Sequence, residues 1–373
     1  MRGRPELYTD YASDQALLNT PAKRWFTFGL LALFLVLSFG WDSNWVSLWT
    51  RIAVLGIGAI GLNLVTGYAG QVSLGHAFFV GLGAYTAAVL GGAPSDTLRG
   101  FELEMWVWLP IAGLVPAVVG AVVAPLAARV RGLYLAILTL GLVFIGEHLF
   151  NEFRSFTGGP GVGRRAAAPV IGGFDLSGRH ELLGISFERG HLFLLFCTFM
   201  LILLGIAARN LARSKVGRAF AAVRDRDIAA EVMGVPLTRT KVLAFTVSSF
   251  YAGICGALLA VLSRQIEPTN FGLLLSVDFL AMILIGGVAT ITGSVVGAAF
   301  IVLMPEFVRN LAPYIPGITT QRGTGGGALL TVFQLEAILF GLLIVGFIVL
   351  EPRGLYGLWL RVRNYWKAWP FSY

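Results

Sequence analysis

The sequence predicts an all-α integral membrane protein with about ten transmembrane helices, some of them short or broken, in two weakly similar halves. The first observation is composition, since 56% of the 373 residues are hydrophobic and only 13% are charged. Soluble domains carry about 25% charged residues, so a soluble protein of this composition could not cover its surface. The second is a series of apolar segments long enough to cross a bilayer. The third is a pair of glycine-flanked interruptions within those segments.

Ten apolar segments are candidate spans, and together they predict a membrane domain over 25–350. The short or glycine-rich segment 73–90 and the 276–308 pair are candidates for broken or re-entrant helices. No small-residue cleavage site follows the first segment, so it is interpreted as an anchor after a tail of 24 residues. The candidate spans are 25–41, 52–67, 73–90, 106–128, 132–150, 191–208, 242–262, 276–287, 293–308 and 329–350.

The distribution of Lys and Arg orients these spans. With a cytoplasmic N-terminus, the inner segments hold about twice as many basic residues as the outer ones. This bias predicts an even number of spans and cytoplasmic tails at 1–24 and 351–373. The arginines of the outer loop 151–190 run against the bias, but long loops obey the rule less strictly.

Two loops are long enough to form structure of their own. The outer loop 151–190 contains the run Thr157–Gly163, which is rich in Gly and Pro and predicts a shaped surface loop with one or two short hairpin strands. In the inner loop 209–241, an apolar stripe of helical spacing predicts one short helix, and 228–233 predicts a second, capped by Asp227 and stopped by Gly234 and Pro236. The stripe consists of Val216, Ala219, Phe220 and Val223. Two helices with a charged turn predict a docking surface, and the alternative is an amphipathic linker on the membrane face.

The two interruptions have a common pattern. Gly70–Gly75 and Gly287–Gly293 each place hydroxyl side chains between glycines, and a segment rich in small residues follows each one. Matched interruptions in two halves are typical of a transport pathway, because freed backbone groups at membrane depth must line a cavity or be buried in protein. The alternative is that these glycines let neighbouring helices pack closely.

Several kinds of chemistry are excluded by the sequence. No P-loop pattern and no His-Glu-x-x-His motif occur. Cys197 and Cys255 both lie in apolar segments, which excludes a disulfide framework and argues against a zinc site. Glu336 is the one plausible start of an intramembrane carboxylate relay, so energy is expected to come from outside the chain. The net charge of +8 is spread over loops and does not indicate a nucleic-acid partner.

Residues 61–76, Gly-Leu-Asn-Leu-Val-Thr-Gly-Tyr-Ala-Gly-Gln-Val-Ser-Leu-Gly-His, strongly resemble the signature of permease subunits of bacterial branched-chain amino acid ABC importers, the LivM-like group. Residues 131–141, the Thr-Gly-Gly of the outer loop, and the stretch from 214–218 to 241–245 are similar to further blocks of that family. The resemblance extends from about residue 45 to 360.

The resemblance also has departures. Importers of this kind carry a Glu-Ala-Ala-x-x-x-Gly loop that docks into the ATPase, and Ile228 stands here where the Glu would be. The family often has Gly and Pro where Ala289 and Ser294 stand. The cytoplasmic loop is still identified as a coupling-helix loop, with ATPase coupling expected at Arg224, Asp225, Asp227, Ala229, Ala230, Glu231 and Gly234.

The family implies a pathway formed with a related permease as a heterodimer, two cytoplasmic ATPase subunits, an extracytoplasmic substrate-binding protein and the inner membrane of a bacterium. No cofactor is expected in this chain, since ATP would be bound by the partner subunits. The residues expected to line the pathway are Gln71, Ser73, His76, Thr290 and Thr292, and the broken-helix glycines are Gly67, Gly70, Gly75, Gly287 and Gly293. For His76 the alternative is an interior hydrogen-bonding group.

Three other functions remain open at this point. A sister class that carries urea or short amides has a similar Gly-Gln-Val/Leu-Ser-Leu-Gly-His block. A stand-alone carrier or channel is the second, and a membrane-embedded enzyme, disfavoured because the cytoplasmic loops lack clustered catalytic groups, is the third.

Overall fold

The computed structural model describes most of the chain from residue 36 to 368. It covers 36–95, 97–130, 132–182, 185–187, 189–311, 318–319, 330–351 and 353–368, with isolated positions before 36. The N-terminal tail 1–24 and most of the first candidate span, 25–41, lie outside the described residues.

Seven described helical segments are long and apolar enough to cross a membrane, and each coincides with a predicted span. Two further predicted spans, 73–90 and 329–350, contain the shorter apolar helical segments His76–Gly91 and Ala337–Phe347, so the expected number of about ten is not established. The similarity of two halves stays a prediction. The long helices are α3 (Ser43–Asn63) with the π-helical turn η1 (Leu64–Tyr68), α5 (Met105–Ala128), α6 (Leu133–Glu152), α8 (His191–Arg213), α11 (Leu237–Ser263), α12 (Leu273–Gly286) with the 3₁₀ turn η2 (Pro268–Phe271), and α13 (Ile291–Leu311); the shorter ones are α4 (His76–Gly91) and α14 (Val332–Leu350).

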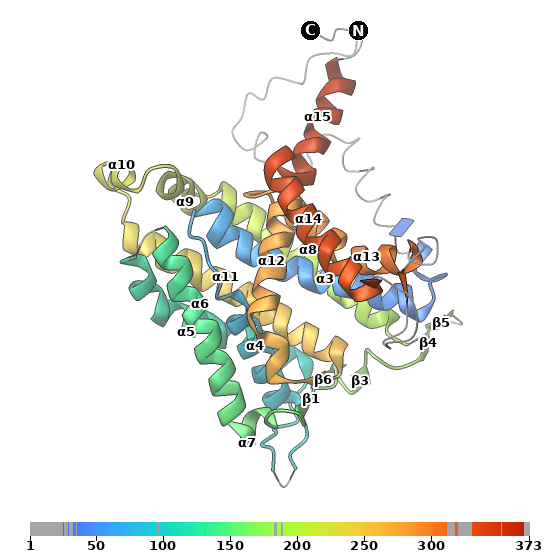
Figure 1. Ribbon diagram of the computed structural model, residues 1–373. Coiled ribbons are helices and arrows are strands. Elements are labelled where there is room, and N and C mark those ends of the chain that lie inside the picture. The colour runs from blue at the N-terminus through green and yellow to red at the C-terminus, as the bar shows by residue number, and fades with distance from the viewer. Residues whose placement is uncertain are drawn as a thin grey trace.

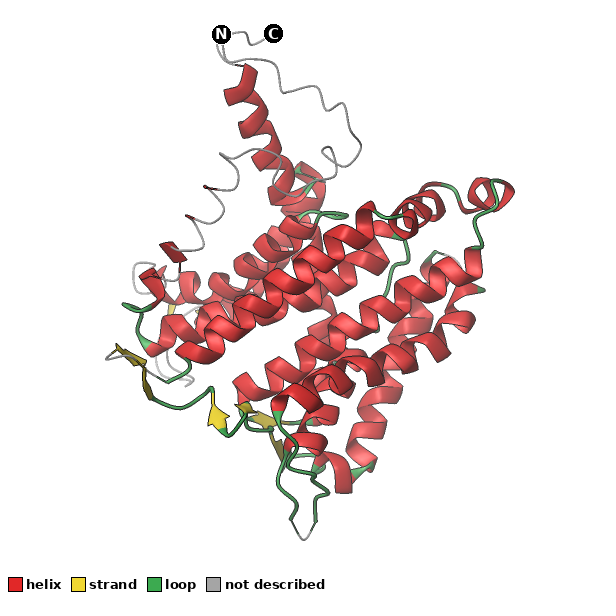
Figure 2. Cartoon of the chain, turned by 180° about the vertical axis from the view of Figure 1, so that it is seen from behind, coloured by secondary structure: helices red, strands yellow, loops and turns green. Residues whose placement is uncertain are grey.

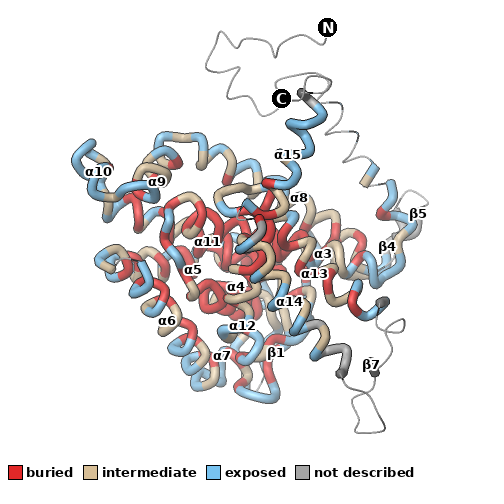
Figure 3. Tube along the Cα trace, turned by 45° about the horizontal axis from the view of Figure 1, so that its top comes forward, coloured by how far each residue is buried: buried red, intermediate tan, exposed pale blue. Residues whose placement is uncertain are grey.

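Helices α3, α4 and α11 form the centre of the bundle (Figure 3). Most of the apolar window of α3 and η1, 83%, is buried, whereas the corresponding share of α8 is 28%. Helices α5, α6 and α8 therefore present apolar side chains outward, such as Val122, Ile137 and Phe199. An exposed apolar belt around a buried centre is the arrangement that a lipid environment favours.

Glycine lets the central helices approach closely. α11 packs most extensively on α5 and α4. A Cβ added at Gly83 of α4 would collide with the carbonyl oxygen and Cα of Gly253 on α11. Without a hydrophobic driving force between helices in lipid, such close contacts supply the packing energy.

Short strands gather at one end of the bundle, and the α9–α10 loop lies at the other (Figures 1 and 2). The predicted outer loop 151–190 forms the short helix α7 (Arg154–Thr157) and two hairpins, as expected, and it also pairs with the segment after α11, which was not predicted. The strands are β1 (Arg164–Arg165) with β6 (Gln265–Ile266), β2 (Val170–Ile171) with β3 (Phe174–Asp175), β4 (His180–Leu182) with β5 (Ile185–Phe187), and the parallel pair β7 (Ile318–Thr319) with β8 (Leu330–Thr331).

Arg164 holds this end together. Its guanidinium is buried and donates hydrogen bonds to the carbonyl oxygens of Ala88 and Phe156, at 3.1 and 3.0 Å, and to that of Arg99. Burial lowers the pKa of this guanidinium, which still remains charged at neutral pH.

The opposite end carries α9 (Lys215–Asp225) and α10 (Asp227–Val232) (Figure 1). The two short helices of the inner loop are therefore present, the second beginning at Asp227 rather than at Ile228. The segment 351–373, expected to be a tail, contains the helix α15 (Gly354–Ala368), which projects from the body.

Candidate functional site

The first interruption lies between α3 and α4. After α3 the backbone widens into the π-helical turn η1, and residues 69–75 are not helical. Two residues after the end of this turn, Gly70 has a φ of +68°, a backbone conformation that glycine adopts without the strain it imposes on a residue with a Cβ. π-Helical turns of this kind are frequent at functional sites. The predicted break in this helix is therefore present, centred on Gly70.

The second interruption lies between α12 and α13. α12 ends at Gly286, α13 begins at Ile291, and Gly287 has a φ of +129°. Ala289 also has a positive φ, +58°, which is unfavourable for a residue with a Cβ. The chain turns sharply here although Ala stands where the family that the sequence resembles often has Gly.

Asn63 joins the two interruptions. Its side chain is buried at the end of α3, and its Oδ1 accepts a hydrogen bond of 2.8 Å from the N–H of Ala289. Its Nδ2 donates to the carbonyl of Thr290 at 2.9 Å and to Oγ of Ser294 at 2.7 Å. One amide thus satisfies donors and acceptors that the missing helical turn leaves free.

Gly67 is needed at this junction because of space. A Cβ at Gly67 would collide with Oδ1 of Asn63 and would lie 2.5 Å from the backbone nitrogen of Ala289. The two interruptions, separated by more than 200 residues of sequence, are therefore in direct contact. We call residues 63–70 and 287–294 together the junction.

The α9–α10 loop touches the junction through Arg224. Its Nη1 donates to the carbonyl of Gly67 at 3.3 Å, and its Nε pairs with Asp225 at 3.0 Å. A Cβ at Gly70 would lie 2.7 Å from Cγ and 3.0 Å from Cα of Arg224. A displacement of α9 along this contact would therefore reach the broken backbone directly.

Within the loop, α9 is anchored by a cap and by buried side chains, whereas α10 is mostly exposed. Oγ of Ser214 accepts hydrogen bonds from the N–H groups of Val216 and Gly217 and so caps α9, while Phe220 and Val223 are buried. In α10 Ala230 is buried, and Oδ1 of Asp227 accepts from the N–H of Ile228 at 2.9 Å.

The tip of the loop is apolar and exposed. The residues concerned are Ile228, Val232 and Met233, of which Met233 is 83% exposed. Of the other residues expected to couple, Ala229 and Glu231 are exposed on α10, and Gly234, with a φ of +84°, ends it. Exposed apolar groups at the end of a polar loop mark an interaction surface.

The predicted pathway residues are divided between the interior and the junction. Gln71, Ser73 and His76 are all buried, and Thr290 and Thr292 lie on and just after the second interruption. Ser73 Oγ accepts from the N–H of Gly75 at 3.3 Å, and the amide of Gln71 donates to the carbonyl of Ala69 at 3.2 Å. Both hydrogen bonds lie within the first interruption.

His76 packs inside the bundle. Its ring lies against Phe279 of α12, with centroids 4.8 Å apart, and its Nε2 is buried without a hydrogen-bond partner among the described residues. The N–H of the next residue, Ala77, donates to Oγ of Ser276 on the same helix, α12, at 3.0 Å. His76 is therefore interior, and its role in the pathway stays a prediction.

Gly75 and Gly293 are positions of close approach. A Cβ at Gly75 would lie 2.9 Å from the carbonyl oxygen of Thr139, whose Oγ1 accepts from the N–H of Leu74 at 2.9 Å. A Cβ at Gly293 would collide with Oγ1 of Thr290 and lie 2.7 Å from the carbonyl oxygen of Gly286.

Three hydrogen-bonding residues of this region were missed by the sequence analysis: Asn63, Thr139 and Ser294. Asn63 was within reach of prediction, because a lone amide at the end of an apolar span requires a buried partner. Thr139 gave no such signal, since Thr is common in membrane helices, where its hydroxyl donates to a carbonyl of the preceding turn. The hydroxyl of Thr139 does so here, to the carbonyls of Leu135 and Ala136.

Among the described residues, no group of three or more His, Cys, Asp or Glu side chains could hold a metal ion. Cys197 and Cys255 are both buried as free cysteines.

Comparisons with known proteins match most of this chain to permeases of branched-chain amino acid transport systems. The family model described as branched-chain amino acid transport system / permease component matches residues 44–349. The high-affinity branched-chain amino acid transport system permease proteins LivM of Salmonella typhimurium and Escherichia coli are each 30% identical over 308 residues, which cover 79% of this chain and 71% of theirs. A probable branched-chain amino acid transport permease protein LivH of Methanocaldococcus jannaschii is 26% identical over 65% of this chain and 73% of its own. No solved structure matches the chain.

Proposed function

The chain belongs to the family of branched-chain amino acid ABC transporter permeases, and from this premise we propose that it forms half of the pathway of an ATP-driven amino acid importer. In this proposal a related permease completes the pathway, two cytoplasmic ATPase subunits supply the energy, and an extracytoplasmic binding protein delivers the substrate. Both termini would lie in the cytoplasm, and the membrane would be the inner membrane of a bacterium.

The observation that carries the proposal is the contact of Arg224 with the junction. α10 would dock its exposed apolar tip, Ile228, Val232 and Met233, in a groove of an ATPase subunit. Because Ile228 replaces the acidic residue of related docking loops, apolar contact would take the place of an ion pair there. Closure of the ATPase pair would then move α9, and Arg224 would transmit that movement to Gly67.

The junction is suited to such a movement because it is held by few groups. Asn63 supplies most of its interhelical hydrogen bonds, and no continuous helix crosses either interruption. Segments with few backbone ladder bonds can exchange between two arrangements at low free-energy cost. Alternating access in transporters uses broken helices of this type.

The decisive experiment is uptake by the assembled transporter in proteoliposomes. With ATP inside and binding protein outside, we expect accumulation of leucine, and Arg224→Glu combined with Asp227→Lys should leave ATP hydrolysis running while uptake is lost. The matched control is Arg239→Ala, which removes an exposed arginine at the start of α11 and should transport normally. Leucine transport by this chain alone, without a nucleotide-hydrolysing partner, would overturn the proposal.

A further inference from the structure

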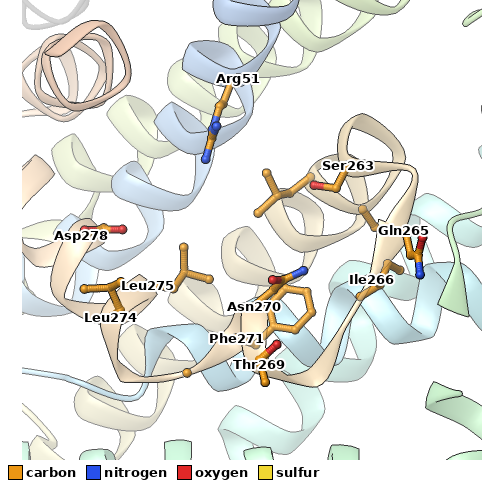
Figure 4. A pocket seen from close by; sticks show the side chains of 13 residues that line it. Arg51, Ser263, Gln265, Ile266, Thr269, Asn270, Phe271, Leu274, Leu275 and Asp278 are labelled. Carbon is orange, nitrogen blue, oxygen red and sulfur yellow. The ribbon is translucent and has the colours of Figure 1, made fainter. Parts of the chain in front are cut away.

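A second polar feature lies at the strand end of the bundle, away from the α9–α10 loop. A pocket of about 370 Å³ opens between α3, the end of α11, β6, η2 and the first turns of α12 (Figure 4). Ligand pockets range from about 300 to 1,000 Å³, so this one suits a small molecule.

The pocket holds one charge of each sign on separate helices. Arg51 extends from α3 and Asp278 from α12, and Figure 4 shows them on different sides of the same space. In the described part of the chain, neither side chain takes part in an ion pair or a hydrogen bond. Both belong to helices long and apolar enough to span the membrane. Arg51 is exposed and Asp278 is half-buried, and within the described residues neither charge is compensated by contact with the other.

The rest of the lining supplies apolar contact and additional polar groups. Leu259 and Leu275 line the pocket beside the charges, and Thr269 and Asn270 offer hydroxyl and amide groups from η2. The N-terminal end of α12 also borders the pocket, since its N-cap residue Gly272 is part of the lining. Glycine has no side chain, so no side chain caps this helix end. Free N–H groups and the dipole at a helix N-terminus favour a negative group nearby.

We infer that this pocket is an entry site for a zwitterionic amino acid with an apolar side chain. The guanidinium of Arg51 receives the carboxylate, the carboxylate of Asp278 receives the ammonium group, and the leucines contact the side chain. The inference rests on the proposed function and adds residues to it at the end of the bundle where no pathway residue was expected. A neutral solute such as urea would form no ion pair with either charge.

The test uses the assembled transporter in lipid nanodiscs without the binding protein. Asn270→Cys places an exposed thiol in the pocket, and the native cysteines are buried, so its labelling by a methanethiosulfonate reagent reports occupancy. Leucine should slow labelling in a saturable way. Isopentylamine lacks the carboxylate of leucine, and 4-methylpentanoate lacks its ammonium group. Each should protect the thiol only at a concentration about tenfold higher than leucine, because one charge-assisted hydrogen bond is lost.

A variant pair assigns the effect to the named charge. Arg51→Gln should raise the leucine concentration needed for half-maximal protection about tenfold. The concentration of isopentylamine needed for the same protection should not change. Arg264→Gln, which neutralises an arginine next to the pocket that does not line it, should leave both unchanged.

The outcomes separate this inference from the proposed function. Labelling that leucine does not slow, in an assembly that still imports leucine with ATP, would overturn the pocket and leave the proposed function standing. Equal protection by leucine and by both analogues would also overturn it, since the charges would then be irrelevant. Leucine protection in an assembly that imports no amino acid would overturn the proposed function alone.

Discussion

Asn63 and Ala289 lie 226 residues apart in sequence, and the side chain of the first accepts a 2.8 Å hydrogen bond from the backbone N–H of the second. The amide of Asn63 therefore takes the place of the helical turn that is absent between α12 and α13. The same amide lies against Gly67, at the start of the other interruption. The two interruptions consequently behave as one structural unit, and a change in either should affect both.

The first prediction removes the amide. Asn63→Ala leaves the part-buried N–H of Ala289 without an acceptor, whereas the hydroxyl of Ser294 keeps its hydrogen bond to the carbonyl of Thr290, and an unsatisfied group of this kind costs about 1–3 kcal/mol. We expect a lower midpoint of thermal unfolding in detergent and a loss of most ATP-driven uptake. The matched control is Asn210→Ala on the exposed side of α8, which should change stability by less than about 0.5 kcal/mol. Equal stability of the two variants would contradict the role assigned to Asn63.

The second prediction concerns the backbone of Ala289. At a φ of +58° this residue pays a steric cost that glycine avoids, and glycine pays more conformational entropy on folding. Ala289→Gly should therefore raise the free energy of unfolding by about 0.5–1 kcal/mol, the difference between these opposing effects.

Ala299→Gly serves as the comparison for that variant, because it lies inside helix α13. There the same substitution should destabilise by about 1 kcal/mol. The two variants thus have opposite predicted signs, and thermal unfolding of both in one detergent measures them. Destabilisation by both would show that the positive φ at Ala289 carries no cost.

Features that local sequence patterns determine were predictable, whereas contacts between residues distant in the sequence were not. Apolar spans and glycine interruptions are local patterns, so seven spans, both breaks and both short inner-loop helices were predictable. The junction was not, since nothing local indicates that Asn63 reaches Ala289. Strand pairing of Arg164 with Ile266 depends on how loops from distant helices meet, and two-residue strands have no usable periodicity.

Helix α15 was missed for a different reason. Its arginines suggested a cytoplasmic tail, and the apolar residues between them, Trp359 and Val362 among others, were not weighed as one face of a helix. A charge count along a terminal segment orients a chain, but it does not distinguish an extended tail from an amphipathic helix.

The third prediction tests the contact between α9 and the junction. Gly70→Ala adds a Cβ that would lie 2.7 Å from Cγ of Arg224, at a φ of +68° that alanine tolerates poorly. We expect uptake to fall at least about tenfold through displacement of α9, while Gly141→Ala, with no atom within 4 Å of the added Cβ, transports normally.

A second change distinguishes crowding from backbone strain at that position. Arg224→Ala removes the Cγ, but the Cα and Cβ of residue 224 stay 3.0 Å from the added Cβ. Arg224→Ala itself should lower uptake, because the contact with the carbonyl of Gly67 is lost. In that background Gly70→Ala should reduce uptake by a smaller factor than it does in the wild-type protein. An equal factor in both backgrounds would assign the whole effect to strain at residue 70 and would contradict crowding against Arg224.

The last prediction fixes the orientation on which the direction of transport depends. Pro160 lies at the strand end and Lys215 begins α9, and both are exposed, so each can carry a reactive thiol. The excess of basic residues at the α9–α10 end predicts that this end is cytoplasmic. In intact cells, Pro160→Cys should be labelled by a membrane-impermeant maleimide, and Lys215→Cys should be labelled only after permeabilisation. Cys197 and Cys255 are buried and should remain unlabelled in both conditions. The reverse pattern would place the α9–α10 loop outside the cell, where no ATPase subunit could reach it, and the proposed coupling would then be impossible.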